Sequence, residues 1–385
     1  MVYAQKFTAD DIHLYFTADD RSARFETMAN LHRVREAITL GYLTDLLDDD
    51  EFMLLYDNNK PSNPEFQYYD YDPFDLEDYN DDECNAYFRF KKDDLYRLKD
   101  ALQIPERIKC TNGYRVQGLE AICILLSRFA YPCRYGDMVK TFARDVPQLC
   151  TISTHMINFV YSEHSYLVET LNRFWLSSEH LMRYASAIHA KGAALKNCWG
   201  FVDGTVRPIC RPKEYQRLCY NGHKRVHALK YQSVTAANGL VANLFGPIEG
   251  RRHDCFLLRE SGLLTELEHR SYDTLGNTLC IYGDPAYPLR AHLQGPFKGN
   301  LTNDQKLYNH SMSSVRVSVE WVFGDMINFF KSTDFKKNQK MGLTACGKMY
   351  IVSGILTNAH TCLYGNSTSK FFELEPPTLE QYFQR

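Results

Sequence analysis

The chain has 385 residues, of which 44% are hydrophobic and 24% charged, a composition typical of folded globular proteins with room for two or three domains. No apolar run approaches the roughly 20 residues of a membrane helix, and the first residues lack a signal-peptide core, so we expect a soluble intracellular protein without a membrane segment. The twelve cysteines form no Cys-x-x-Cys pair. This spacing argues against a disulfide framework and against a cysteine-based zinc site.

The net charge of −3 hides an uneven distribution along the chain. Residues 1–86 hold 6 Lys and Arg against 21 Asp and Glu, and the remainder holds 38 against 26, so the two balances are −15 and +12. A basic body suggests contact with a polyanion such as nucleic acid. A solvated acidic tail on an ordinary basic domain explains the same composition equally well.

The N-terminal region, 1–86, combines a predicted helix within 25–56 with a Tyr- and Asp-rich segment. Residues 61–88 contain no basic side chain, and eight carboxylates lie between Tyr68 and Glu83. We predict that residues 61–83 form a mobile linker, and binding of a basic partner or mimicry of nucleic acid is the alternative.

Residues 87–190 are predicted to form an all-helical domain. The predicted helices cover 91–102, 115–129, 135–142 and 177–194, and Thr151 or Ser153 would cap one more helix. A long helix, a turn, a short helix, a turn and a further helix resemble a helix-turn-helix, a DNA-binding arrangement. A plain helical bundle is the alternative interpretation.

Residues 191–364 show a different pattern, in which β-rich runs alternate with turns. Strands are predicted over 199–202, 227–236, 240–245 and 279–282, and helices over 254–267 and 343–363 and around 314–323. The Asn238-Gly239 pair is typical of a hairpin turn. Three strands in a meander, a helix, a fourth strand and terminal helices give an α/β order that matches an RNase H-like fold, a mixed sheet flanked by helices. Residues 365–385 would form a C-terminal tail.

Three carboxylates lie at the ends of predicted strands or on a predicted helix. Asp203 ends the first strand, Asp284 follows the fourth, and Glu320 lies in the amphipathic run 314–323. Taken singly, Asp203 reads as a turn residue, Asp284 as a loop residue, and Glu320 as half of an i, i+4 ion pair with Arg316. Together they can converge on one point, where they would repel one another unless divalent cations lay between them.

Such a centre suits the cleavage of phosphodiester bonds. Two metal ions about 3.5–4 Å apart can activate a water or a 3′-hydroxyl and stabilise charge on the attacking and leaving oxygens. We expect two Mg²⁺ ions, with Mn²⁺ as an alternative, because Mg²⁺ prefers oxygen ligands and keeps several waters. Asp203 would bridge both ions, Asp284 would hold one, and Glu320 would hold the other.

The motifs around these carboxylates resemble the Harbinger (PIF-type) transposase family, whose DDE nuclease domain carries two aspartates and a glutamate on an RNase H-like fold. The resembling blocks are Phe201-Val-Asp-Gly-Thr205, Tyr220-Asn-Gly-His-Lys-Arg225, Gly246-Pro-Ile-Glu-Gly-Arg-Arg-His-Asp254, Tyr282-Gly-Asp-Pro-Ala-Tyr287 and Arg316-Val-Ser-Val-Glu320. The resemblance covers residues 88–364 and is strongest from 197 onward. Val206 departs from the histidine that many members carry there, which puts one contact in doubt.

The resemblance implies a nuclear protein that acts on transposon ends and on target DNA. It favours the helix-turn-helix interpretation of residues 87–190. It also implies a second, Myb/SANT-like DNA-binding protein that helps DNA binding and carries the chain from the cytoplasm into the nucleus. Homo-oligomerisation is left open.

Basic residues surround the triad and are predicted to contact DNA phosphates, with a solvated basic face as the alternative. The predicted DNA contacts are Arg207, Arg211, Lys213, Lys224, Arg225, Arg251 and Arg252. His253, Asp254 and Arg316 are candidate accessory residues, although Asp254 could merely cap a helix. The leading hypothesis is a metal-dependent endonuclease or transposase. A domesticated, non-catalytic DNA-binding or recruiting protein is the alternative, and a generic RNase H-like nuclease is a weaker third.

Overall fold

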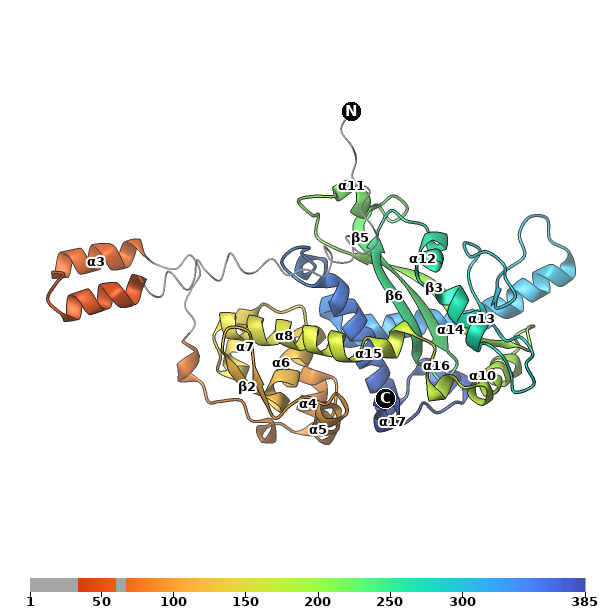
Figure 1. The fold of residues 1–385 in the computed structure, drawn as a ribbon, viewed down its shortest axis with the longest axis horizontal. Coiled ribbons are helices and arrows are strands. Elements are labelled where there is room, and N and C mark those ends of the chain that lie inside the picture. Colours follow the sequence, from red (N-terminus) through yellow and green to blue (C-terminus); the bar gives the residue numbers. More distant parts are fainter. Residues whose placement is uncertain (1–33, 60–66, 385) are drawn as a thin grey trace, which may run out of the picture.

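The structure is a computed structural model that describes residues 34–59 and 67–384. It has a helical part, a mixed sheet covered by helices, and an N-terminal helical hairpin that projects from the body (Figure 1). None of the helices in these ranges is long and apolar enough to cross a bilayer. All twelve cysteines are free thiols.

The N-terminal hairpin consists of a helical stretch over 34–43 and helix α3 (Asp49–Asn58). Asp48 caps α3, since its side chain accepts a hydrogen bond from the Glu51 N–H at 2.8 Å. In return, the Glu51 side chain accepts one from the Asp48 N–H. Ile38 is the buried apolar residue between the two helices. The prediction of helix over 25–56 is wrong at 44–48, where a turn separates the two helices, and its first part, 25–33, lies outside the described residues.

The acidic segment after residue 67 is bound to the helical part, so the prediction of a mobile linker is wrong for this stretch. Two 3₁₀ turns, η1 (Tyr68–Asp70) and η2 (Leu76–Asp78), carry Leu76 into the core at 2% exposure. The Phe74 ring lies 4.9 Å from that of Phe142. Apolar side chains interspersed among the carboxylates therefore anchor the segment while the carboxylates stay in water.

The helical part contains a β-hairpin that the sequence pattern did not indicate. Its helices are α4 (Asp81–Phe88), α5 (Lys92–Ala101), α6 (Gly118–Ala130), α7 (Tyr135–Phe142), α8 (Val146–His164), α9 (Tyr166–Glu169) and α10 (Ser178–Ala190). Between α5 and α6, strands β1 (Arg107–Lys109) and β2 (Arg115–Gln117) pair antiparallel. The all-helical prediction is wrong here because Gly113, at φ 79°, closes a turn between two short alternating runs.

Helix α8 begins earlier than predicted, and neither Thr151 nor Ser153 caps it. Asp145 is the N-cap, accepting the Gln148 N–H at 2.7 Å, and Pro147 lies in the first turn, where its missing N–H costs nothing. The order of α6, α7 and α8 follows the predicted helix-turn-helix. The residues of α8 from 146 to 161 are buried or partly exposed.

The sheet confirms the predicted α/β class. It contains β3 (Cys198–Pro208), β5 (Val226–Ala236), β6 (Val241–Glu249), β7 (Cys280–Tyr282) and β8 (Leu293–Gln294), with the short β4 (Tyr220–Asn221) beside β5. The order across the sheet is β6-β5-β3-β7-β8. The first three strands pair antiparallel, whereas β3, β7 and β8 run parallel. This order and these directions are consistent with an RNase H-like fold.

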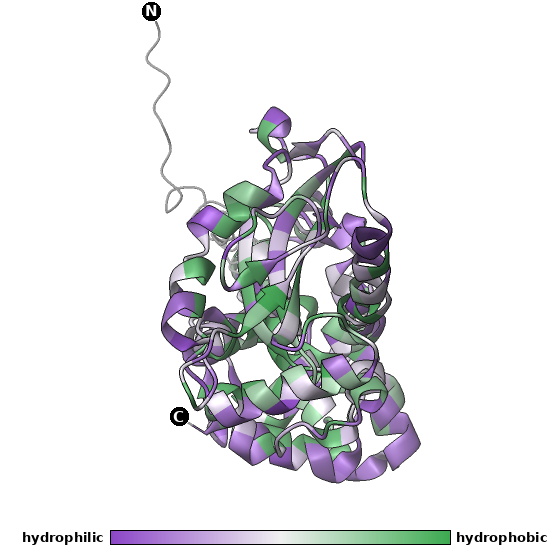
Figure 2. Cartoon of the chain, turned by 90° about the vertical axis from the view of Figure 1, so that its right-hand side faces the viewer, coloured by the Kyte–Doolittle hydropathy of each residue, from purple (hydrophilic) through white to green (hydrophobic). Residues whose placement is uncertain are grey.

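Helices cover the sheet and join it to the helical part. The C-terminal half contributes the short α11 (Gln216–Cys219), then α12 (Asp254–Glu260), α13 (Leu263–Arg270), α14 (Asn303–Phe329) and α15 (Cys346–Tyr364). Helix α15 is buried along most of its length and packs on both α8 and β6. The central strands are largely apolar, whereas the surrounding helices carry hydrophilic outer faces (Figure 2). Most of the buried apolar side chains form one continuous core.

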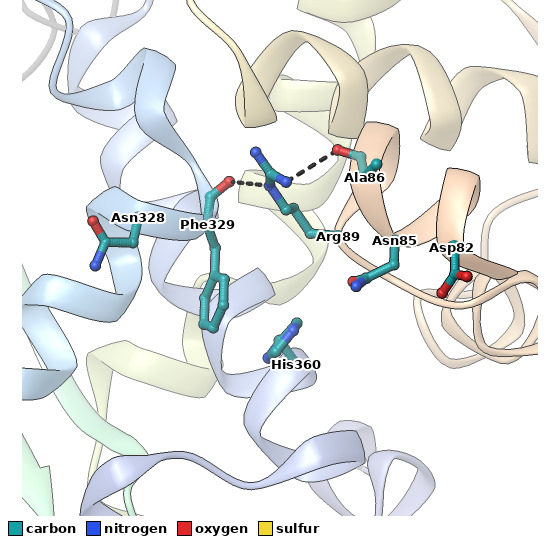
Figure 3. A pocket seen from close by; sticks show the side chains of 7 residues that line it. All are labelled: Asp82, Asn85, Ala86, Arg89, Asn328, Phe329 and His360. Atoms are coloured by element: carbon teal, nitrogen blue, oxygen red, sulfur yellow. Dashed lines mark hydrogen bonds between the residues drawn. The ribbon is translucent and has the colours of Figure 1, made fainter.

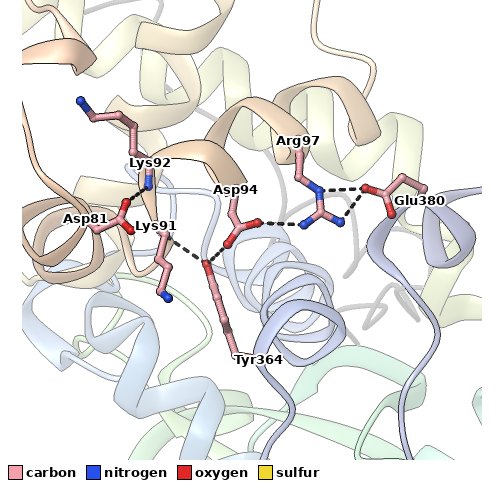
Figure 4. A network of polar contacts seen from close by, with 7 residues as sticks. All are labelled: Asp81, Lys91, Lys92, Asp94, Arg97, Tyr364 and Glu380. Atoms are coloured by element: carbon pink, nitrogen blue, oxygen red, sulfur yellow. Dashed lines mark hydrogen bonds and ion pairs between the residues drawn. The ribbon is translucent and has the colours of Figure 1, made fainter.

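The segment expected as a C-terminal tail, 365–385, contains two packed helices, α16 (Ser367–Phe372) and α17 (Leu379–Phe383). The ring of Phe372 stacks on that of Phe201 in β3. A polar network joins α17 and the end of α15 to α5 (Figure 4). In it, Tyr364 donates to Asp94 at 2.7 Å, and Arg97 bridges Asp94 and Glu380 at 2.9 and 2.8 Å.

Candidate active site

Asp203 lies within a strand, not at its end. Strand β3 continues to Pro208 because it pairs with β5 over its whole length, and Asp203 faces Ser233 in that register. The prediction that Asp203 ends the first strand is therefore wrong. Its side chain is 18% exposed, and its Oδ1 accepts the N–H of Gly204 at 2.9 Å.

Asp284 lies level with Asp203 because of the parallel pairing of β3 with β7. Phe201 pairs with Tyr282, so the residues two places further along each chain occupy equivalent positions. Neighbouring strands are about 4.8 Å apart, and residues two apart on a strand share a face. Asp284 follows the end of β7, and its Oδ1 accepts the Ala286 N–H at 2.9 Å. The sheet thus positions both aspartates from a single register.

Glu320 approaches the two aspartates from helix α14. Arg316, one turn before Glu320, places its Nη2 3.0 Å from Oδ2 of Asp203. This ion pair, not the surface Arg316–Glu320 pair considered from the sequence, fixes the helix against β3. Glu320 is exposed and close enough to raise the pKa of Asp203. Of the three predicted carboxylates, Asp203 is therefore influenced electrostatically by the other two.

A fourth carboxylate, Asp254, stands next to this group. Its Oδ1 lies 2.6 Å from Nζ of Lys230, which is buried in β5. A side chain at Gly204 would collide with it, since an added Cβ would lie 2.6 Å from the same oxygen. His253 is the exposed N-cap residue of α12, and Asp254 is the first residue of that helix, so Asp254 does not cap it.

Burial raises the pKa of Asp203 to about 6. This value includes the effects of Arg316 and the Gly204 N–H, which lower the pKa, and of Asp284 and Glu320, which raise it. A carboxyl whose pKa is raised toward neutrality, under the influence of two further carboxylates, marks a place where negative charge is concentrated and incompletely compensated.

The donor set suits a hard divalent cation. All four groups offer carboxylate oxygens, the ligands preferred by Mg²⁺ and Mn²⁺. Within residues 34–59 and 67–384, no three His, Cys, Asp or Glu side chains are spaced to hold a metal ion together. The positive charge that contacts Asp203 in this structure is the guanidinium of Arg316.

The pKa of Asp203 predicts that cation binding depends on pH. An unfolded aspartate titrates near 3.9, so the folded protein keeps a proton that the unfolded chain loses between about pH 4 and 6. The stabilisation from this proton is therefore complete below pH 4 and is lost as pH rises through 6. A cation must displace the proton. We expect Mg²⁺ to raise the melting temperature clearly at pH 7.5, and about tenfold more Mg²⁺ to be needed for the same rise at pH 5.

Thermal unfolding over a Mg²⁺ titration at both pH values measures this effect. Asp203→Asn is the control, because it removes the titrating group and should abolish the difference between the two pH values. An identical Mg²⁺ dependence of the wild-type melting temperature at pH 5 and 7.5 would contradict the expectation.

Two of the seven predicted DNA-contacting residues are only partly exposed to solvent. Arg207 is largely buried, pairs with Asp334 at 3.1 Å and lies over the Tyr350 ring. Arg252 pairs with Glu249 at 3.2 Å and lies over Phe256. The exposed members of the set are Arg211, Lys213, Lys224, Arg225 and Arg251.

The fold brings a second basic segment to Arg211. The N–H of Cys210 donates to the carbonyl of Gln339 at 2.8 Å, which places Arg211 beside the turn η5 (Lys336–Asn338). Arg211 and Lys336 both help to lower the pKa of His227, after burial. Exposed lysines at 331, 336, 337 and 340 extend the basic surface.

A separate cavity of about 370 Å³ lies at the far end of α14 (Figure 3). Its lining comprises Asp82, Asn85, Ala86, Arg89, Asn328, Phe329 and His360. Arg89 donates to the carbonyl oxygens of Phe329 and Ala86 at 3.1 and 3.0 Å. Nine residues of helix separate Phe329 from Glu320, which is about 14 Å along the axis, so this cavity is not part of the carboxylate site.

Residues 202–358 match the family model of the DDE superfamily endonucleases. The matched span contains Asp203, Asp254, Asp284 and Glu320. Neither a curated protein nor a solved structure shows significant similarity to the chain. The match supports a DDE transposase-type nuclease. A nuclease domain of this kind implies DNA binding, and its family generally uses divalent metals.

Proposed function

From the match of residues 202–358 to DDE superfamily endonucleases, we propose that the protein is a metal-dependent DNA endonuclease or transposase with Asp203, Asp284 and Glu320 as its catalytic residues. The observation that carries this proposal is the parallel register of β3 and β7. This register aligns β3, which carries Asp203, with β7, which ends two residues before Asp284, and Arg316 on the helix bearing Glu320 pairs with Asp203.

Asp203, Asp284 and Glu320 would hold Mg²⁺ or Mn²⁺, and Asp254 is placed to assist. When bound, the ions activate the attacking oxygen and stabilise charge on the leaving oxygen. Arg316 neutralises Asp203 in the metal-free protein, and Lys230 does the same for Asp254. In hydrolysis, water attacks the phosphorus and the bond to the leaving 3′-oxygen breaks, which leaves a 3′-hydroxyl and a 5′-phosphate. In strand transfer, that 3′-hydroxyl replaces water as the nucleophile.

DNA would lie across the basic surface formed by Arg211 and the lysines of 331–340. Replacing both Arg211 and Lys336 with glutamine is expected to weaken DNA binding uniformly across sequences and to lower the slope of log K against log salt by about 2. Fluorescence anisotropy over a salt series measures this slope. The matched control replaces Lys191 and Lys370, which lie on other elements, and should leave the slope within about 0.5 of the wild-type value. An unchanged slope in the Arg211/Lys336 variant would place the DNA elsewhere.

Within the DDE nucleases, the motif blocks favour the Harbinger type. We propose on that basis that transposon ends and target DNA are the substrates, that a Myb/SANT-like protein assists, and that the protein works in the nucleus.

The experiment that tests the function is cleavage of a labelled DNA pool by the purified chain, with Mg²⁺ or Mn²⁺ against EDTA, alone and with the Myb-like partner. Nicking that requires the metal is the expected result. Tight DNA binding without cleavage in every condition would instead support a domesticated DNA-binding or recruiting protein. All three triad residues are present, which favours the nuclease.

A further inference from the structure

The connection between β3 and β5 forms a short β-hairpin at one end of the sheet, next to α11 (Figure 1). In this hairpin, Tyr220 of β4 pairs with His227 of β5. The buried side chain of Asn221 ties the hairpin to the loop after β6. It accepts a hydrogen bond from the Lys224 N–H at 2.8 Å and donates one to the Gly250 carbonyl at 2.7 Å. The backbone at Tyr220 is therefore held both by the strand pairing and by the turn.

Tyr220 presents its ring on the outside of this hairpin. The residue is 42% exposed, and its ring centroid lies 5.4 Å from that of His227 at an interplanar angle of 66°. This edge-to-face contact supports the ring on one side and leaves part of it in contact with solvent. An exposed aromatic ring on a fixed backbone is a surface on which a nucleobase can stack.

The connection that carries Tyr220 is strongly basic. Residues 209–226 contain one acidic side chain, Glu214, and five Lys and Arg side chains, all exposed: Arg211, Lys213, Arg217, Lys224 and Arg225. The N–H of Ile209 donates to the His227 carbonyl at 2.9 Å, so His227 lies beside the segment that leads to Arg211. Cations that bind phosphates, next to an aromatic ring that stacks on bases, are the combination that binds single-stranded nucleic acid.

A second exposed tyrosine provides a comparison. Tyr87 is 46% exposed on α4. That helix contains three acidic residues in its first turn and no basic residue, so its charge opposes contact with phosphates. Tyr87 therefore shares the exposure of Tyr220 but not its basic surroundings, and it serves as the matched control below.

We propose that Tyr220 stacks on an unpaired base of the DNA substrate, while the cations of residues 209–226 bind the phosphates on either side. This inference rests on the proposed action on DNA and deepens it, because it adds unpaired nucleotides to the substrate. The ring and the candidate active site lie along one strand. His227 precedes Ser233, the partner of Asp203, by six residues, which is about 20 Å along β5.

The test measures binding of the full-length protein to two labelled DNAs in EDTA, so that no metal-dependent cleavage occurs. One DNA is a fully paired duplex, and the other is the same duplex with a short run of unpaired nucleotides that contains the fluorescent base 2-aminopurine. Wild type should bind the second DNA more tightly. We expect Tyr220→Ala to weaken binding to the second DNA about 5- to 100-fold, and to leave binding to the paired duplex within about twofold of wild type.

Two further variants separate stacking from other effects. Tyr220→Phe keeps the ring, and Tyr87→Ala removes a ring of similar exposure elsewhere, so both should bind the two DNAs as wild type does. Stacking on the tyrosine ring should quench the 2-aminopurine fluorescence when wild type or Tyr220→Phe binds, but not when Tyr220→Ala binds.

Four results would overturn the inference. Equal affinity of Tyr220→Ala and wild type for the unpaired DNA would remove the stacking role and leave the proposed function intact. Equal losses on both DNAs would assign Tyr220 to the folding of the hairpin. A loss in Tyr220→Phe as large as that in Tyr220→Ala would assign the effect to the hydroxyl. Failure of wild type to bind either DNA would overturn the proposed function, and the inference with it.

Discussion

Glu320→Gln is expected to reduce metal-dependent DNA cleavage by about a thousand-fold or more, while DNA affinity stays within about threefold of wild type. Glutamine keeps the shape of the side chain but loses the charge that holds a cation. Glu320 is exposed on α14, so the substitution costs little stability. Single-turnover cleavage at saturating protein separates the chemical step from binding. Asp203→Ala and Asp284→Ala should give comparable losses.

Glu268→Gln is a suitable matched control for that experiment. Glu268 is likewise exposed on a helix, α13, and has no place in the carboxylate site. Its cleavage rate should equal that of wild type. Metal-dependent cleavage that survives in any one of the Asp203, Asp284 or Glu320 variants would remove that residue from the catalytic set.

Asn358→Ala is expected to destabilise the protein by about 3–5 kcal/mol. Asn358 is fully buried on α15, and its side-chain amide bonds both backbone groups of one residue in β6. It donates to the Val241 carbonyl at 2.9 Å and accepts the Val241 N–H at 2.8 Å. It also donates to the Tyr382 hydroxyl at 3.0 Å. Alanine leaves these buried groups without partners, and the lost hydrogen bonds join β6 to the C-terminal helices.

Denaturant unfolding followed by far-ultraviolet circular dichroism measures that loss. Asn328→Ala is the control, because Asn328 is exposed on α14 and should change the free energy of unfolding by no more than about 0.5 kcal/mol. If Asn358→Ala unfolds at the same denaturant concentration as this control, the side-chain pairing with β6 contributes nothing to stability.

The β-rich runs were sufficient to predict β3, β5, β6 and β7 and their order along the chain, because each of these strands has its own local pattern. The two-residue strands β4 and β8 were missed. The limits of the strands were less predictable. Strand β3 continues six residues beyond Val202, since its pairing with β5 outweighs the turn tendency of Asp203-Gly204. The β1–β2 hairpin was missed because three-residue strands carry too little periodicity to compete with the helices around them.

The candidate site was predictable in its residue types but not in its contacts. Asp203, Asp284 and Glu320 could be singled out because they follow strands or lie on an amphipathic helix. The pairing of Arg316 with Asp203 depends on how α14 crosses β3, which no local pattern encodes. Tyr287 was quoted within a motif but given no role, because its burial next to β3 exists only after folding. The only earlier signal was its position three residues after Asp284.

Helices α15 and α17 pack on the helical part, and this has a consequence for synthesis. The ring of Phe383 packs 5.4 Å from that of His164, and Glu380 pairs with Arg97. These partners are separated by more than 200 positions in the chain. At translation rates of about 5–20 residues per second, α5 and α8 emerge from the ribosome roughly 10–60 s before α17 exists. During that interval α5 and α8 lack the contacts that α17 makes with them in the folded protein.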